Sequence, residues 1–155
     1  MENDDGDNND GAKVHVWPIR VYYEDTDAAG IVYYANYLKF VERARTELLR
    51  EIGIDHSRLQ AEDGIAFAVR ECAIDYRAPA RLDDALEVRT RLLEISGAAI
   101  RAEQTVYRGE DLLVVATLRI VCLRANGRPA RLPAGLRAAM DPYRTRPTTP
   151  QPERA

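Results

Sequence analysis

The sequence predicts an α+β domain in which one long helix is followed by consecutive antiparallel strands. Apolar residues recur at helical spacing across residues 34–52, from Tyr34 to Ile52. From residue 66 the pattern changes to alternating and short apolar runs separated by turns. The chain has 155 residues, 46% of them hydrophobic, which is the size and composition of one domain with a sizeable core. We expect a sheet that curls around the apolar face of the helix.

The composition excludes several classes of protein. The formal net charge of -3 argues against nonspecific binding of nucleic acid. Apolar runs are too short for a membrane span, and the acidic start does not resemble a signal peptide. Cys72 and Cys122 lie in strand-like runs without C-x-x-C spacing, which predicts buried free thiols in a reducing compartment. We therefore expect a cytoplasmic protein with no nucleic-acid partner and no membrane span.

The two ends of the chain differ in composition from its middle. Residues 1–12 are polar and acidic, and residues 142–155 are rich in Pro and Thr. Neither segment has enough apolar side chains to bury, so both are predicted to be disordered tails. This leaves a single domain over residues 13–141.

The first half of the domain combines an edge strand with the long helix. Residues 14–23 alternate loosely, and Pro18 places this strand at a sheet edge. After the helix, Gly53 is a typical C-terminal stop, and Asp55 can cap a short second helix over residues 56–62.

The second half is predicted to contain four strands. Along residues 66–76 the apolar side chains switch from one face of the strand to the other near Arg70 and Glu71, which indicates a bulge. Residues 86–92 alternate clearly, residues 98–107 follow a Ser-Gly turn, and residues 108–111 form a second hairpin turn around Gly109. Residues 112–123 are apolar on both faces, so we expect this strand at the centre of the sheet or at a subunit contact. Residues 136–140 form a helical turn in this prediction.

The turn before the long helix is acidic, with Glu24, Asp25 and Asp27 followed by Gly30. Carboxylates at this place are typical of a helix cap, which the spacing alone favours. A second interpretation is that one carboxylate acts on an acyl group whose carbonyl is polarised by helix N-H groups. A calcium loop is a third, but Ala29 and Asn36 stand where oxygen ligands are needed, so no metal is expected. His15 and His56 have no catalytic setting, which disfavours a Ser-His-Asp mechanism.

Three stretches of the chain carry a family resemblance. Residues 22–45 (YYEDTDAAGIVYYANYLKFVERAR) resemble the signature of the 4-hydroxybenzoyl-CoA thioesterase family, and most closely its YbgC branch. Residues 66–88 and 112–123 resemble later blocks of the same family. The resemblance implies a hotdog fold, in which a curved antiparallel sheet of about five strands wraps a long central helix. It also implies a homodimer or homotetramer with active sites where two subunits join.

The resemblance also implies a set of site residues. Asp27 matches the catalytic carboxylate, either as general base or as nucleophile, and the Tyr34 backbone amide matches the helix N-terminus facing the thioester carbonyl. Tyr34 stands where many YbgC-type members have a His. The implied substrate-binding residues are Gly30, Ile31, Val32, Tyr33 and Tyr37, and Arg77 and Arg81 are candidates for the phosphates of coenzyme A. The tyrosines can equally be core residues, and the arginines can be solvated surface.

The function that these expectations imply is an acyl-CoA thioesterase without a cofactor, with coenzyme A as part of the substrate. An acyl carrier protein is an alternative carrier. A different class of function is a non-catalytic acyl-thioester-binding or scaffold protein of the Tol-Pal system and lipid metabolism. A hotdog dehydratase is disfavoured because no His lies near the acidic turn.

Overall fold

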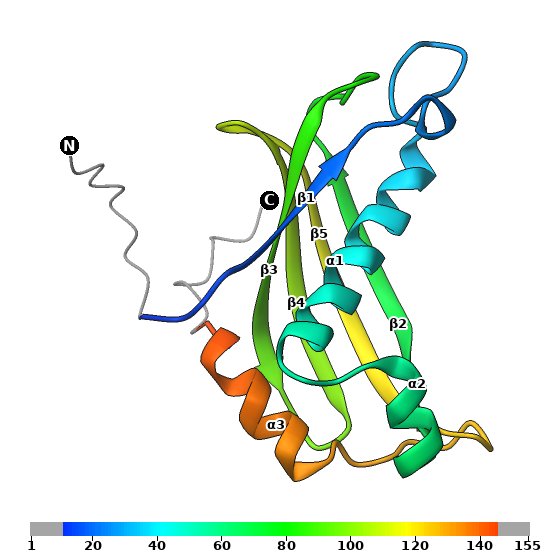
Figure 1. The fold of residues 1–155 in the computed structure, drawn as a ribbon, viewed down its shortest axis with the longest axis vertical. Coiled ribbons are helices and arrows are strands. Elements are labelled where there is room, and N and C mark those ends of the chain that lie inside the picture. The colour runs from blue at the N-terminus through cyan, green and yellow to red at the C-terminus, as the bar shows by residue number, and fades with distance from the viewer. Residues whose placement is uncertain (1–10, 146–155) are drawn as a thin grey trace, which may run out of the picture.

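The computed structural model describes residues 11–145. One five-stranded sheet curves around a long helix, α1, which lies against one of its faces (Figure 1). This confirms the predicted α+β class. The elements in chain order are β1 (His15–Arg20), α1 (Tyr37–Glu51), α2 (His56–Arg58), β2 (Ile65–Tyr76), β3 (Ala85–Ile95), β4 (Ala99–Arg108), β5 (Asp111–Arg124) and α3 (Ala134–Met140).

The strand order is β1-β3-β4-β5-β2, and every neighbouring pair is antiparallel. β1 lies at one edge, where Pro18 pairs with Glu87, as the sequence predicted. β5 lies between β4 and β2, which confirms its central position. The predicted bulge is also present, since the register of β2 against β5 shifts between Val69 and Glu71.

The long helix begins later than predicted. Tyr34–Asn36 forms a 3-10 turn, and the α-helix starts only at Tyr37. The Asn36 N-H donates to the Tyr33 carbonyl at 2.8 Å, which tightens this turn beyond α-helical geometry. At the other end Gly53 has φ 88°, so it stops the helix as predicted. Asp55 accepts the Arg58 N-H at 2.7 Å and caps α2.

The face of α1 that meets the sheet is apolar along its length. Its buried residues follow helical spacing and are Tyr37, Phe40, Val41, Ala44 and Leu48. The first half of this face packs with residues of β1, β3 and β5 in one core cluster. The Leu48 end packs in a second cluster with residues of β4, β5 and α3.

A buried polar network joins α1 to the middle of the sheet. Gln104 on β4 is fully buried, and its amide donates to the Val41 carbonyl at 2.8 Å and to the Thr90 hydroxyl at 3.0 Å. Its oxygen accepts a hydrogen bond from the Arg45 guanidinium at 2.9 Å. Both halves of this side chain amide are therefore paired inside the core.

The outer strand β2 is unusually exposed. Val69 and Tyr76 are 47% and 44% exposed, although both are large apolar or aromatic side chains. Cys72 is exposed as well, so the prediction of two buried thiols is wrong for Cys72 and confirmed for Cys122. The reason is that β2 has a neighbouring strand, β5, on one side only.

The chain after β5 returns to the core. α3 confirms the predicted helical turn, and Leu136 and Met140 are buried. Tyr143 is also buried, and the Thr145 N-H donates to the Leu92 carbonyl at 2.8 Å, so the first residues of the predicted tail pack on the sheet. Residues 1–10 and 146–155 of the two tails lie outside the described residues. Within residues 11–145 no helix is long and apolar enough to cross a membrane.

Candidate active site

The acidic turn between β1 and α1 is closed by its own backbone. Thr26 and Val32 form an antiparallel bridge across it. Inside the bridge the Asp27 N-H donates to the Ile31 carbonyl, and the Gly30 N-H donates to the Asp27 carbonyl, both at 2.9 Å. Gly30 has φ 77°, which residues with a Cβ rarely adopt. These bonds therefore fix the backbone of Asp27 within the turn.

Asp25 is fixed inside the turn. It is only 6% exposed, and its Oδ2 accepts the Tyr22 N-H while its Oδ1 accepts a hydrogen bond from the Asn36 amide, each at 2.8 Å. The Asp25 carbonyl also accepts the Tyr33 N-H at 2.9 Å. Asp25 thus ties the turn to the residues before α1. Asp25 caps the short 3-10 turn Tyr23–Asp25, but neither aspartate caps α1 itself.

Asp27 has a different environment. Its side chain is half-buried, and its Oδ1 accepts the Ala29 N-H at 2.8 Å, which orients the carboxylate. Its Oδ2 has no hydrogen bond or ion pair with any other residue that the structure describes. One oxygen of Asp27 is therefore held and the other is available to a substrate or a water molecule.

The geometry does not fit a calcium loop. Such a loop needs the oxygens of both Asp25 and Asp27 as ligands. Both oxygens of Asp25 already accept hydrogen bonds from Tyr22 and Asn36. Across residues 11–145 there is no cluster of three or more His, Cys, Asp or Glu that could hold a metal ion.

The backbone amides that follow the turn differ in their partners. The Val32 N-H donates to the Ala80 carbonyl at 2.8 Å, and the Tyr33 N-H is bound by Asp25. The Tyr34 N-H, the first of the 3-10 turn, has no carbonyl acceptor among the described residues, as expected for the first N-H groups of a helix. The Tyr34 amide is therefore free to donate to an oxygen of a bound molecule.

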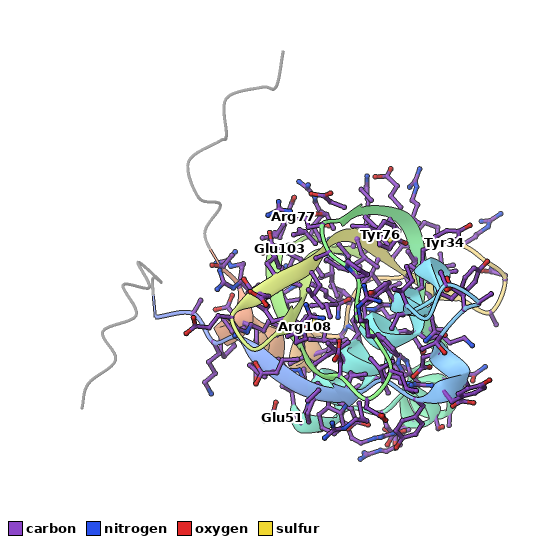
Figure 2. The ribbon with its side chains drawn as sticks, turned by 90° about the horizontal axis from the view of Figure 1, so that it is seen from above. Tyr34, Glu51, Tyr76, Arg77, Glu103 and Arg108 are labelled. Carbon is purple, nitrogen blue, oxygen red and sulfur yellow. The ribbon has the colours of Figure 1, made fainter. Side chains whose placement is uncertain are left out.

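The three tyrosines separate into two groups. Tyr37 is buried, its hydroxyl accepts the Ala80 N-H at 3.1 Å, and burial raises its pKa. It is therefore a core residue. Tyr33 and Tyr34 are 48% and 62% exposed, with ring centroids 5.0 Å apart. The Tyr76 hydroxyl of β2 donates to the Tyr34 carbonyl at 3.0 Å, and Figure 2 shows these two residues near each other.

The remaining candidates differ in their contacts. Ile31 and Arg81 form a backbone bridge, which brings Arg81 beside the acidic turn with an exposed side chain. Val32 is 2% exposed and belongs to the core. Arg77 instead forms an ion pair with Asp75 at 3.0 Å. The loop carrying Arg81 is fixed by Asp84.

Asp84 holds that loop through two partners. Its Oδ2 accepts the Arg81 N-H at 2.8 Å and a hydrogen bond from Arg108 at 2.9 Å. Burial opposes ionisation of Asp84, but these two partners outweigh it and lower the pKa of the carboxyl group. The carboxylate is therefore charged wherever the site operates near neutral pH.

A cavity lies under the second half of α1, away from the acidic turn. Its volume is about 220 Å³, and its floor is made by aliphatic and aromatic side chains from α1, β2, β3, β4, β5 and α3 (Leu48, Leu49, Phe67, Leu92, Ile100, Ala102, Ile120 and Met140). Glu42, Arg45, Thr46 and His56 are its polar lining residues on the helices. The sequence does not predict this cavity, because helical spacing identifies the face that is buried but not gaps in its packing.

Asn36 and Tyr76 also contact residues of the candidate site, although neither was among the site residues predicted from the sequence. Asn36 has low helix propensity and precedes an apolar helical run, which is a signal for a residue with a boundary role. Tyr76 gave no such signal, because its contact with Tyr34 spans 42 residues of sequence.

Three comparisons with known proteins agree with one another. The model of the Thioesterase-like superfamily matches residues 21–140. The acyl-CoA thioesterase YbgC of Haemophilus influenzae is 45% identical over 124 residues, 79% of this chain and 91% of its own. The acyl-CoA thioester hydrolase YbgC of Escherichia coli is 47% identical over 108 residues, 69% of this chain and 80% of its own. The crystal structure of a probable thioesterase from Bartonella henselae has a TM-score of 0.76 at 39% identity, covering 78% of this chain and all of that one.

Proposed function

The chain belongs to the Thioesterase-like superfamily as a YbgC-type hotdog thioesterase, and we propose that it hydrolyses an acyl-CoA with Asp27 and the Tyr34 amide as its catalytic groups. The observation that carries this assignment is the difference between the two aspartates. Asp25 uses both oxygens to hold the turn, while Asp27 is oriented through one oxygen and leaves the other available.

The proposed reaction uses water as the second reactant. Asp27 accepts a proton from water while the water oxygen bonds to the thioester carbon, and the carbonyl oxygen becomes an oxyanion. The Tyr34 N-H donates to that oxyanion. The tetrahedral intermediate then collapses, the C–S bond breaks, and the thiolate of coenzyme A takes up the proton, leaving the free acid. Direct attack by the Asp27 carboxylate, through a mixed anhydride that water hydrolyses, gives the same products.

Two further features support a bound acyl-CoA at this place. Arg81 lies beside the turn with an exposed guanidinium, which suits a phosphate of coenzyme A, whereas Arg77 is already paired with Asp75. Tyr33 and Tyr34 present exposed rings at the same corner, on which the pantetheine arm or an acyl group can pack. Val32 and Tyr37 support these residues from the core.

The proposed assembly is a homodimer joined through β2. β1, the other edge, has six residues and contains Pro18, whereas β2 has twelve residues without a proline and exposes Val69, Cys72 and Tyr76. Long exposed edges of this kind are sites for pairing with another chain. In a tetramer, two such dimers associate and each keeps its contact through β2. Free cysteines accord with the reducing cytoplasm, where we place the protein.

The test is thiol release from short aliphatic, long aliphatic and aromatic acyl-CoAs, and from the same acyl groups on acyl carrier protein. We expect Asp27→Asn to lower kcat/KM by about 10²–10⁴-fold, the usual range for a general base. Glu24→Gln, an exposed carboxylate in the same turn, is the matched control and should retain activity. Near-normal turnover by Asp27→Asn would refute the assignment. Binding of acyl-CoA without release by the wild type would instead favour an acyl-binding scaffold role, such as one in the Tol-Pal system.

A further inference from the structure

The segment that carries the Tyr34 amide is tied to the acidic turn through Asp25. The Asp25 carbonyl accepts the Tyr33 N-H at 2.9 Å, and its Oδ1 accepts a hydrogen bond from the Asn36 side chain at 2.8 Å. These two bonds meet the chain before and after Tyr34. Asp25 and Asn36 are 6% and 8% exposed, so water has little access to the bond between them. Because Asp27 follows Asp25 closely in the chain, the same turn holds both this segment and the Asp27 carboxylate.

β2 holds the same segment from the sheet. The Tyr76 hydroxyl, at the end of β2, donates to the Tyr34 carbonyl at 3.0 Å. Its ring also contacts two aromatic rings, with centroids 6.2 Å from Tyr34 and 5.8 Å from Tyr37. Tyr37 is itself fixed, since its hydroxyl accepts the Ala80 N-H. Tyr76 therefore fastens the residues before α1 to the end of the strand, as Figure 2 lets the reader follow.

The bonded groups surround one backbone donor that is not bonded. The Tyr33 N-H, the Tyr34 carbonyl and the Asn36 side chain all have partners. The Tyr34 N-H has no acceptor among the described residues. A donor that is held by its neighbours and free at its own hydrogen is preorganised for an oxyanion, because it need not reorient when charge develops.

We infer that Asn36 and Tyr76 are positioning residues for thioester hydrolysis, and that they align the Tyr34 N-H with the Asp27 carboxylate. The inference rests on the proposed thioesterase function. In this role neither residue needs a contact with the substrate, because Asn36 acts through Asp25 and Tyr76 acts through the Tyr34 carbonyl. A misplacement of about 1 Å in such a site can cost roughly 10²-fold in rate. Loss of either bond should therefore lower kcat.

A purely structural role for the two residues makes a different prediction. Tyr76 is 44% exposed, so loss of its hydroxyl should leave the unfolding midpoint close to that of the wild type. Asn36 is buried, and Asn36→Ala leaves the Asp25 Oδ1 without this partner, so the midpoint should fall. If the residues only stabilise the fold, Tyr76→Phe keeps the wild-type rate. If they position the amide, both variants have a lower kcat while fully folded.

The first experiment measures kcat and KM of Tyr76→Phe and Asn36→Ala with an acyl-CoA that the wild type hydrolyses. We expect each variant to lose about 10–100-fold in kcat, with KM within about twofold of wild type, because the affected contact forms only in the transition state. Circular dichroism at the assay temperature checks that both are folded, and Tyr76→Phe carries the test if Asn36→Ala is not. Unchanged kcat in Tyr76→Phe, or a loss confined to KM, would overturn the inference.

The matched controls remove the same groups elsewhere in the chain. Tyr107 follows the buried Val106 on β4, so its side chain lies on the face of the sheet opposite α1, where its ring contacts the Arg89 guanidinium. Asn126 lies in the turn after β5, where its oxygen accepts the Arg128 N-H at 3.0 Å. Tyr107→Phe and Asn126→Ala should retain the wild-type kcat. A comparable loss of kcat in these controls would count against a specific role for Asn36 and Tyr76.

The second experiment asks whether the two residues act through the Tyr34 N-H. Tyr34→Pro deletes this N-H. The position suits proline because Tyr34 is the first residue of the 3-10 turn, and because Tyr33 has φ -58° and ψ 128°, close to the conformation that precedes proline. Tyr34→Ala is the reference that keeps the N-H. Relative to this reference, Tyr34→Pro should lower kcat by about 10²–10³-fold, the usual cost of one oxyanion donor.

Tyr76→Phe and Asn36→Ala are then combined with each of these two backgrounds. With Tyr34→Ala, each should again lower kcat by about 10-fold or more. With Tyr34→Pro, the further loss should be less than about twofold, because the group that they position is absent. Equal losses in both backgrounds, or full activity of Tyr34→Pro, would overturn the inference. Absence of thiol release by the wild type from every acyl-CoA would instead refute the thioesterase function itself, so the two failures are distinguishable.

Discussion

Buried polar side chains lie near both ends of α1, but their hydrogen bonding is complete at only one end. Before its start, Asp25 and Asn36 are 6% and 8% exposed and bind each other. Near its end, His15 is also 6% exposed, with Nε2 3.3 Å from Glu51, but its Nδ1 is buried without a partner among residues 11–145. Complete pairing at the first end gives a rigid support that holds Asp27 with one free oxygen. Incomplete pairing at the second end makes stability depend on the protonation of one ring.

The largest expected effect comes from removing the support at the first end. Asp25→Ala leaves the Tyr22 N-H and the Asn36 amide without their charged acceptor, and should lower the free energy of unfolding by about 3 kcal/mol. Asp27→Asn, two residues later, should change it by less than about 0.5 kcal/mol. Urea denaturation of both variants measures the difference. Equal destabilisation by the two substitutions would mean that the aspartates share one structural role.

A smaller effect on stability is expected to distinguish Tyr37 from Tyr34, both near the start of α1. Tyr37→Phe leaves the buried Ala80 N-H without its acceptor, and should destabilise the fold by about 1–2 kcal/mol. Tyr34→Phe is the matched control, because its side chain is 62% exposed and should cost less than about 0.5 kcal/mol. Thermal unfolding of the pair tests this. A larger loss from Tyr34→Phe would contradict the division into core and surface tyrosines.

The smallest expected effect is a pH dependence of the unfolding free energy, which arises from His15 near the end of α1. Burial lowers the pKa of His15 below its ordinary value, and the nearby Glu51 and Glu47 oppose this only in part. Between the ordinary pKa of about 6.5 and the lower folded one, the unfolded chain binds more protons. His15 should therefore contribute stability above about pH 6.5 that is lost as the pH falls through that window.

The control uses the only other histidine in the chain. His15→Gln should flatten the fall in unfolding free energy on acidification, whereas His56→Gln, on the exposed α2, should leave it in place. Denaturation series between pH 7 and pH 5 measure both variants. If the unfolding free energy of His15→Gln falls with pH as steeply as that of the wild type, the buried ring does not control the loss of stability.

The sequence could predict the elements of the fold because each has a local signal. Spacing located α1, alternation located β3, and the parity change located the bulge in β2. The start of α1 was predicted three residues too early, because nothing local shows that Asn36 binds Asp25. Family resemblance pointed to Asp27 and Tyr34, but the roles of Asp25, Tyr76 and the cavity depend on contacts between distant residues. Cys72 was predicted to be buried because an edge strand and a central strand have similar composition.

The network around Gln104 has a mechanical consequence for the enzyme. Gln104 of β4 is bonded to both Val41 and Arg45 of α1, so a roll or axial slide of α1 over the sheet must break these two hydrogen bonds together. α1 is thus unsuited to act as a moving lid. Any movement that admits a substrate is therefore expected in the loops around the helix and not in α1 itself.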